Sequence, residues 1–298
     1  MSMPLLLFPD LALILIGALL YRLTDWGDAF WSGLEKLVYY VLFPTLLFAS
    51  IMRTRFALAE TAPFVATGLA ALATGIALGF LARPVLQPQP RQFASGVQCA
   101  FRFNSYIALA LASRVGGEAG LALIAVMVGF AVPIANIVAV WPLARHANAG
   151  VLSEMARNPL ILATASGLAC NFAGLSLPEP VAMTMSRLGQ AALALGLLAV
   201  GAGLRFGSIH GARAFAVWIT AVKLAAMPAA VLGVGTLLAL PAGPMRMAML
   251  FAAMPTATSS YVLANRMGGD GQLVAWLVSV STLASIVTMP LWLTLVAG

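Results

Sequence analysis

The chain has 298 residues, of which 62% are hydrophobic and only 8% are charged. Because a soluble domain carries about 25% charged residues, this composition excludes an ordinary soluble protein and predicts a polytopic membrane protein. The formal net charge of +7 comes from lysines and arginines scattered singly along the chain, which argues against a nucleic-acid-binding surface.

Ten apolar segments of about 20 residues each predict ten transmembrane helices in an all-α protein. We place them at 5–22, 34–53, 62–82, 93–113, 119–141, 158–174, 184–204, 214–239, 246–265 and 272–296. The connections between them are short, so we expect one transmembrane domain over residues 1–298. The first segment contains Asp10 and has no basic residues before it, so we interpret it as a span rather than a cleaved signal peptide.

Basic residues between the segments predict the orientation of the chain. With the N-terminus outside, nine lysines and arginines fall on the cytoplasmic side and five on the opposite side. This excess predicts that both termini lie outside. We expect the protein to lie in a bacterial inner membrane. Arg102 and Lys223 fall within apolar segments instead, where a charge is seldom found without a role.

Short matching motifs indicate an internal repeat. The motif RVGGE at 114–118 and the motif RMGGD at 266–270 lie 152 residues apart, and two Arg-Phe pairs, at 55–56 and 205–206, lie 150 residues apart. These offsets predict one repeat over 1–145 and a second over 146–298. Since each repeat would contain five spans, the second must be inserted with the opposite orientation, as is common in secondary transporters.

The ninth segment contains a proline in its middle, Pro255, within AAMPTATSSYVLAN. A mid-helix proline removes one backbone hydrogen bond, and the hydroxyl residues that follow it could satisfy freed backbone groups or line a cavity. At the repeat offset, Asn104 falls opposite Thr256. Two interpretations stay open here: an ordinary kinked helix, and a discontinuous helix that lines a binding site.

An ordered set of motifs over nearly the whole chain resembles the auxin efflux carrier family, within the bile-acid transporter superfamily. The set is VLFPTLLFASI (41–51), FRFNSYIALA (101–110), RNPLILATASGL (157–168), ALGLLAVGAGL (194–204), KLAAMP (223–228), AAMPTATSSYVLANRMGGD (252–270) and STLASIVTMP (281–290).

The resemblance implies two inverted five-helix repeats whose fourth and ninth helices are interrupted and cross where the substrate binds. It further implies a scaffold unit and a transport unit that move in an elevator-like, alternating-access mechanism. Bacterial members similar to this chain are described as carriers of small carboxylates such as malonate or malate. The fourth segment departs from the pattern, because Phe103-Asn104-Ser105 contains no proline.

The FRFNSYIALA motif supplies the principal candidate for substrate binding. A guanidinium can bind a carboxylate through two parallel hydrogen bonds, so Arg102 is a candidate ligand for an organic anion. The alternative is that Arg102 extends to the membrane interface. Residues near the expected crossing complete the candidate site: Asn104, Ser105, Pro255, Thr256, Thr258 and Ser259.

Lys223 and Asp10 are candidates for coupling transport to an ion. Lys223 could carry a proton, or it could be a structural lysine bonded to backbone carbonyls. The two crossing segments lack acidic residues, so we favour proton coupling or electrogenic transport over sodium coupling. The glycines of the seventh segment, Gly196, Gly201 and Gly203, are expected at close helix contacts.

The sequence therefore predicts a secondary transporter for a small carboxylate, in a lipid bilayer, with no cofactor. Cys99 and Cys170 form no CxxC pair, so no metal site is expected, and no HExxH or DxxD motif indicates an enzyme. An auxin-like or bile-acid-like anion carrier with sodium coupling, a channel and a non-transporting membrane protein are the alternatives. A homodimer is a candidate assembly.

Overall fold

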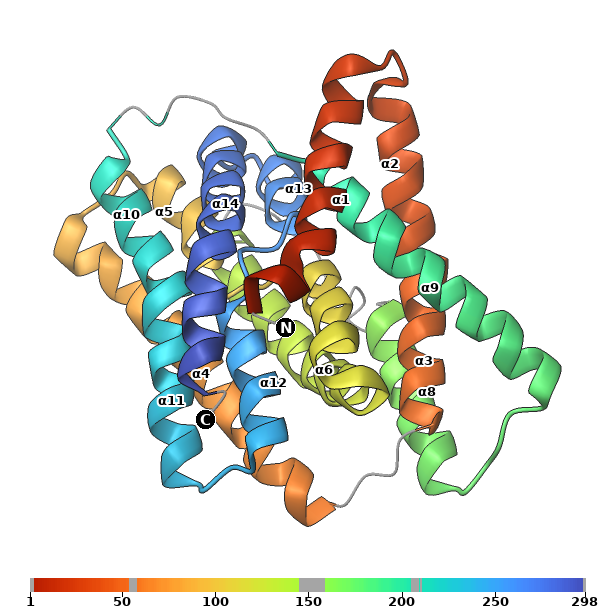
Figure 1. The fold of residues 1–298 in the computed structure, drawn as a ribbon. Coiled ribbons are helices and arrows are strands. Elements are labelled where there is room, and N and C mark those ends of the chain that lie inside the picture. Colours follow the sequence, from red (N-terminus) through yellow and green to blue (C-terminus); the bar gives the residue numbers. More distant parts are fainter. Residues whose placement is uncertain (1–2, 54–57, 145–158, 205–208, 210, 297–298) are drawn as a thin grey trace. The chain divides into compact units, whose positions relative to one another are not determined.

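A computed structural model of the chain describes residues 3–53, 58–144, 159–204, 209 and 211–296. For a few of these, including Asp10 and Arg266, only the backbone is described. Over the described ranges the protein is all-helical, with no β-strand, which confirms the predicted class (Figure 1). Five stretches in these ranges are long and apolar enough to cross a membrane: Thr61–Leu86, Pro90–Leu143, Glu179–Ala202, Arg213–Leu237 and Gly271–Leu295. The second of them is interrupted between Ala100 and Ser105. The count of ten crossings stays a prediction.

The helices form two compact units, and each unit takes segments from both halves of the chain. The first unit contains residues 1–61, 106–130 and 152–203, and the second contains residues 62–105, 131–151 and 204–298. The boundary predicted between the sequence repeats, at residues 145 and 146, lies outside the described residues.

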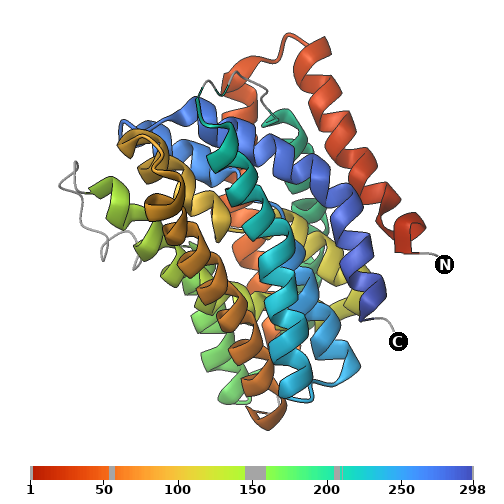
Figure 2. The same cartoon turned by 90° about the vertical axis from the view of Figure 1, so that its left-hand side faces the viewer.

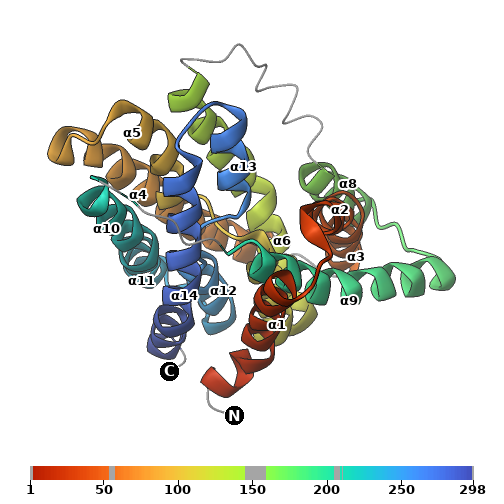
Figure 3. The same cartoon turned by 90° about the horizontal axis from the view of Figure 1, so that it is seen from above.

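The first unit is built on close contacts between helices. Its elements are α1 (Met3–Leu23), α2 (Gly27–Leu37), η1 (Val38–Leu42), α3 (Phe43–Arg53), α8 (Pro159–Phe172), α9 (Glu179–Ala202) and the 106–130 part of α6 (Ser105–Ala144). A side chain on Gly201 would overlap the carbonyl of Ile14, and one on Gly196 would press on the Phe43 ring. These small residues let α9 lie against α1 and α3 (Figure 3), as the sequence predicted. Gly203 instead forms the C-cap of α9.

The second unit contains the remaining described helices. They are α4 (Leu58–Leu86, from residue 62 onward), α5 (Pro90–Gly96), η2 (Val97–Ala100), α10 (Arg213–Ala221), η3 (Val222–Ala226), α11 (Met227–Leu237), α12 (Ala242–Ala253), α13 (Ser259–Arg266) and α14 (Gly271–Leu295), together with Ser105 and the 131–144 part of α6. The indole nitrogen of Trp218 on α10 donates a hydrogen bond to the Leu78 carbonyl of α4, at 2.8 Å. Gly75 of α4 faces Met227, so α4 and the α10–η3–α11 stretch lie alongside each other (Figure 2).

Two stretches of π-helix, η1 and η3, have a common local cause. Each is followed after one residue by a proline, Pro44 after η1 and Pro228 after η3. Because proline has no N–H group, it leaves the carbonyl four residues earlier without its α-helical donor. In the second unit that carbonyl belongs to Leu224, and Trp292 Nε1 donates to it at 2.9 Å. The π-helical turn that results contains Lys223.

Candidate functional site

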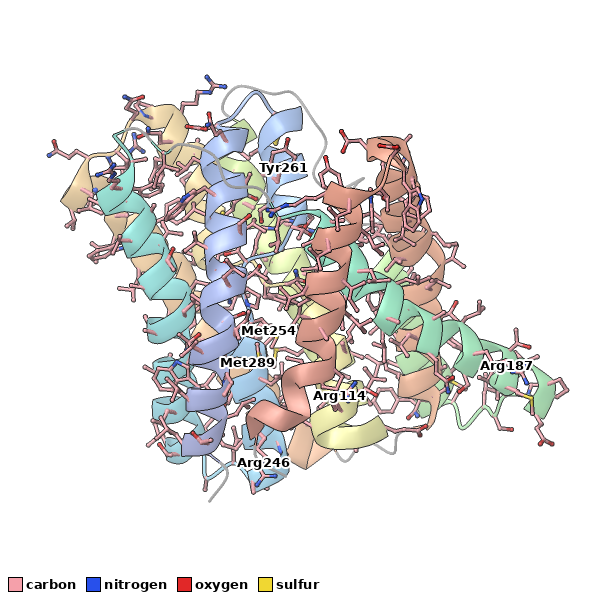
Figure 4. All side chains as sticks on the ribbon, turned by 45° about the horizontal axis from the view of Figure 1, so that its top comes forward. Arg114, Arg187, Arg246, Met254, Tyr261 and Met289 are labelled. Carbon is pink, nitrogen blue, oxygen red and sulfur yellow. The ribbon has the colours of Figure 1, made fainter. Side chains whose placement is uncertain are left out.

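Two helices of the second unit are interrupted, and the interruptions contain the candidate residues found in the sequence. The first interruption separates η2, which ends at Ala100, from α6, which begins at Ser105. The second separates α12, which ends at Ala253, from α13, which begins at Ser259. Figure 4 labels Met254 at the start of the second interruption and Tyr261 in α13, just beyond it. The fourth predicted segment is therefore broken even though it contains no proline there.

Hydrogen bonds join the two interrupted segments directly. The backbone N–H of Asn104 donates to the Pro255 carbonyl at 2.9 Å. The hydroxyl of Thr256 donates to the Cys99 carbonyl at 2.8 Å, at the end of η2. Asn104 and Thr256 are 2% and 1% exposed, so their side chains lie inside the unit. We interpret Asn104, Pro255 and Thr256 as residues that hold the two segments together.

Arg102 connects the two interruptions through its side chain. One terminal guanidinium nitrogen donates to Gln98 Oε1 at 2.9 Å, and the other donates to Ser259 Oγ at 2.9 Å. These bonds hold the guanidinium against η2 and α13. Arg102 is half-buried, and so are Ser105 and Thr258, while Ser259 is exposed. Of the seven candidate residues, these four are the ones whose side chains are not buried.

Neighbouring helices satisfy backbone groups that the second interruption releases. The N–H of Thr256 donates to Ser281 Oγ on α14, at 3.2 Å. The ammonium of Lys223 lies 3.4 Å from the Ala252 carbonyl, in the last turn of α12. Such helix-end groups have no partner within their own helix, so other side chains must supply one in a buried place. Lys223 thus makes the contact expected of a structural lysine bonded to a backbone carbonyl, which was one of its two predicted interpretations.

Sequence analysis missed three residues at the interruptions. Gln98 accepts a hydrogen bond from Arg102 and donates one to the Ser260 carbonyl at 3.3 Å. The signal for Gln98 is its position four residues before Arg102, which is helical spacing. Ser281 belongs to the STLASIVTMP motif but was not assigned a role. The hydroxyl of Ser260 is buried and has no hydrogen-bond partner among the described residues.

Several predicted features cannot be placed at this site. Asp10 lies in α1, in the first unit, and its side chain is outside the described residues. The part of the chain that the structure describes has no group of three or more His, Cys, Asp or Glu side chains that could hold a metal ion.

Comparison with known proteins assigns the chain to a family. A family model described as "Membrane transport protein" matches residues 141–293, just over half of the chain. The chain belongs to this membrane transport family. The match includes η3, both sides of the second interruption and most of α14. It confirms the resemblance to the auxin efflux carrier family that the sequence motifs indicated.

Two relatives resemble this membrane transport protein over nearly its whole length. One, from Rhizobium meliloti (strain 1021), is named "Putative malonate transporter" and is 27% identical over 305 residues, covering 95% of this chain and 92% of the relative. The other is an "Uncharacterized transporter" from Methanothermobacter thermautotrophicus, 26% identical over 294 residues, with 95% and 94% covered. The protein is therefore an integral membrane transporter rather than an enzyme.

Proposed function

We propose that the protein is a secondary transporter that moves a small organic anion, a malonate- or malate-like carboxylate, by alternating access. The observation that carries this proposal is the half-buried guanidinium of Arg102, held between the two interrupted helices. The relative named as a malonate transporter supports the substrate class.

The chemistry around Arg102 suits an anion. A carboxylate can accept two parallel hydrogen bonds from a guanidinium, and it is a stronger acceptor than the Ser259 hydroxyl that now takes one of them. The helices α6 and α13 begin at Ser105 and Ser259, and the N-terminal end of a helix favours negative charge. The bound carboxylate replaces Ser259 as an acceptor of Arg102, and Ser105, Thr258 and Ser259 supply hydroxyl contacts.

The division of the chain supports a moving transport unit. Both interruptions and the seven candidate substrate-binding residues lie in segments assigned to the second unit. An anion bound to them would therefore travel with that unit, while the first unit serves as the scaffold of an elevator-type mechanism. The same proposal includes ten spans in two inverted repeats, both termini outside the inner membrane, and a homodimer.

Coupling to protons or electrogenic transport fits the composition better than sodium coupling. The segments 90–105 and 242–266, which contain the two interruptions, have no aspartate or glutamate. A sodium site gains much of its affinity from carboxylate oxygens, which are absent from these segments. Asp10 and Lys223 stay the two candidate proton carriers.

Counterflow in proteoliposomes tests the proposed function. Liposomes loaded with unlabelled malonate, malate or succinate are diluted into a trace of the labelled compound. A carrier accumulates label transiently above equilibrium and saturates, whereas a channel gives no overshoot. We expect Arg102→Gln to reduce the counterflow rate about tenfold or more, because it removes the charge that pairs with the carboxylate.

The matched control is Arg187→Gln, since Arg187 is exposed on α9 (Figure 4). We expect this variant to retain the native counterflow rate. Absence of an overshoot with all three dicarboxylates would overturn the proposal, and so would equal rates for Arg102→Gln and Arg187→Gln.

A further inference from the structure

Half-helix α12 ends inside the second unit, where its C-terminal end needs a partner. The last four carbonyls of an α-helix have no donor within the helix, and together they form the negative end of its dipole. In α12 these carbonyls belong to residues 250–253, and all four residues are fully buried. Bulk water does not reach these buried residues, so their carbonyls need partners within the protein.

Lys223 supplies a cation at this place. Its side chain is 0% exposed, and its ammonium lies 3.4 Å from the Ala252 carbonyl and 3.4 Å from the Met227 sulfur. No acidic side chain among the described residues interacts with it. A buried cation requires a compensating negative group. For Lys223 this group is the partial negative charge of the Ala252 carbonyl at the end of α12.

The local sequence accounts for the direction in which the Lys223 side chain extends. Pro228 removes the donor to the Leu224 carbonyl, and the chain accommodates this with the π-helical turn η3. Figure 1 shows α12 beside α11 and α14, and α12 also packs against η3 itself. Trp292 of α14 fills the missing hydrogen bond at Leu224, so α14 fixes the turn from which Lys223 reaches α12.

We propose that Lys223 in its protonated form is a positioning residue: its ammonium caps the C-terminal end of α12 and holds segment 254–258 where it meets the first interruption. The position of this segment matters for the contact between the interruptions. Its Pro255 carbonyl accepts a hydrogen bond from the Asn104 N–H, and the adjacent Ser259 hydroxyl accepts one from Arg102. Ser281 holds the same segment from α14 through the Thr256 N–H.

Hydrogen–deuterium exchange of the purified full-length protein, without substrate, tests this capping role separately from the proposed function. The amides of residues 254 and 256–260 are compared in the native protein, Lys223→Met and Lys223→Arg. We expect about tenfold faster exchange in Lys223→Met, because the cap is lost, and exchange within about twofold of native in Lys223→Arg, which keeps a charged donor. Amides of α9 in the first unit serve as the internal reference.

The chain provides a matched control, because its only other lysine, Lys36, is exposed on α2. Lys36→Met should exchange like the native protein. Native-like exchange of 254–260 in Lys223→Met would overturn the capping role, as would equally fast exchange in Lys223→Met and Lys223→Arg. If Lys223→Met fails to fold, Lys223→Gln replaces it: exchange faster than in Lys223→Arg supports a charged cap, and equal exchange overturns it.

Discussion

Replacing Thr256 by valine removes one hydrogen bond between the interrupted helices while it preserves the shape of the side chain. The Thr256 hydroxyl donates to the Cys99 carbonyl at 2.8 Å, and the residue is only 1% exposed. Valine fills the same volume but cannot donate, so the variant leaves a buried carbonyl without this partner. The crossing should lose stability without acquiring a cavity or a clash.

The magnitude follows from the burial of this hydrogen bond. A buried group left without a partner costs about 1–3 kcal/mol in soluble proteins, and side-chain hydrogen bonds in a membrane protein average about 0.6 kcal/mol with a maximum of about 1.7. Because the Thr256–Cys99 bond joins two helix interruptions rather than neighbouring turns, we expect about 1–1.5 kcal/mol. That loss changes the unfolding equilibrium constant about tenfold.

Reversible unfolding in mixed micelles, by titration with a denaturing detergent, measures this loss. Thr256→Ser keeps the hydroxyl and should lose less stability than Thr256→Val. The matched control is Thr236→Val, because Thr236 is exposed on α11 and its hydroxyl bonds only to carbonyls of its own helix. We expect the control to change the free energy of unfolding by less than about 0.5 kcal/mol. Equal losses in Thr256→Val and Thr236→Val would refute the reasoning.

Two further substitutions, Gly201→Ala in the first unit and Trp292→Phe in the second, test packing through the same unfolding titration, with Gly233→Ala as a control. Gly201→Ala should lower the free energy of unfolding by about 1–3 kcal/mol, because its new methyl group overlaps the Ile14 carbonyl. Gly233→Ala, at an open position of α11, should raise it by about 0.5–1 kcal/mol. A loss in Gly201→Ala no larger than the change in Gly233→Ala would contradict the close contact. Trp292→Phe should lose about 1 kcal/mol, because the Leu224 carbonyl loses its indole donor. Native stability of Trp292→Phe would show that this donor is not needed.

The sequence predicted the structure best at residues whose own backbone chemistry determines the local conformation. Pro255 lacks an N–H group, so a break in the ninth segment could be expected from this residue, and the interruption lies there. Gly196 and Gly201 have no side chain, so a close approach of another helix could be expected as well. The long apolar segments likewise predicted an all-helical membrane protein from composition alone.

Features that depend on distant partners could not be obtained in this way. The segment from Phe101 to Asn104 contains no helix-breaking residue, and its interruption depends on bonds to Pro255 and Thr256, about 150 residues later. The oxygen partner of Lys223 is a backbone carbonyl, which every residue possesses, so nothing in the sequence distinguishes Ala252.

The most direct test of a carboxylate site at Arg102 is thermal stabilisation of the detergent-purified protein by malonate, malate, succinate and indole-3-acetate. The native protein, Arg102→Gln and Arg187→Gln are compared, each against its own melting temperature without ligand. We predict that at least one small dicarboxylate raises the melting temperature of the native protein and of Arg187→Gln, and leaves that of Arg102→Gln unchanged. Equal stabilisation of all three proteins, or stabilisation by none of the four compounds, would contradict a carboxylate site at Arg102.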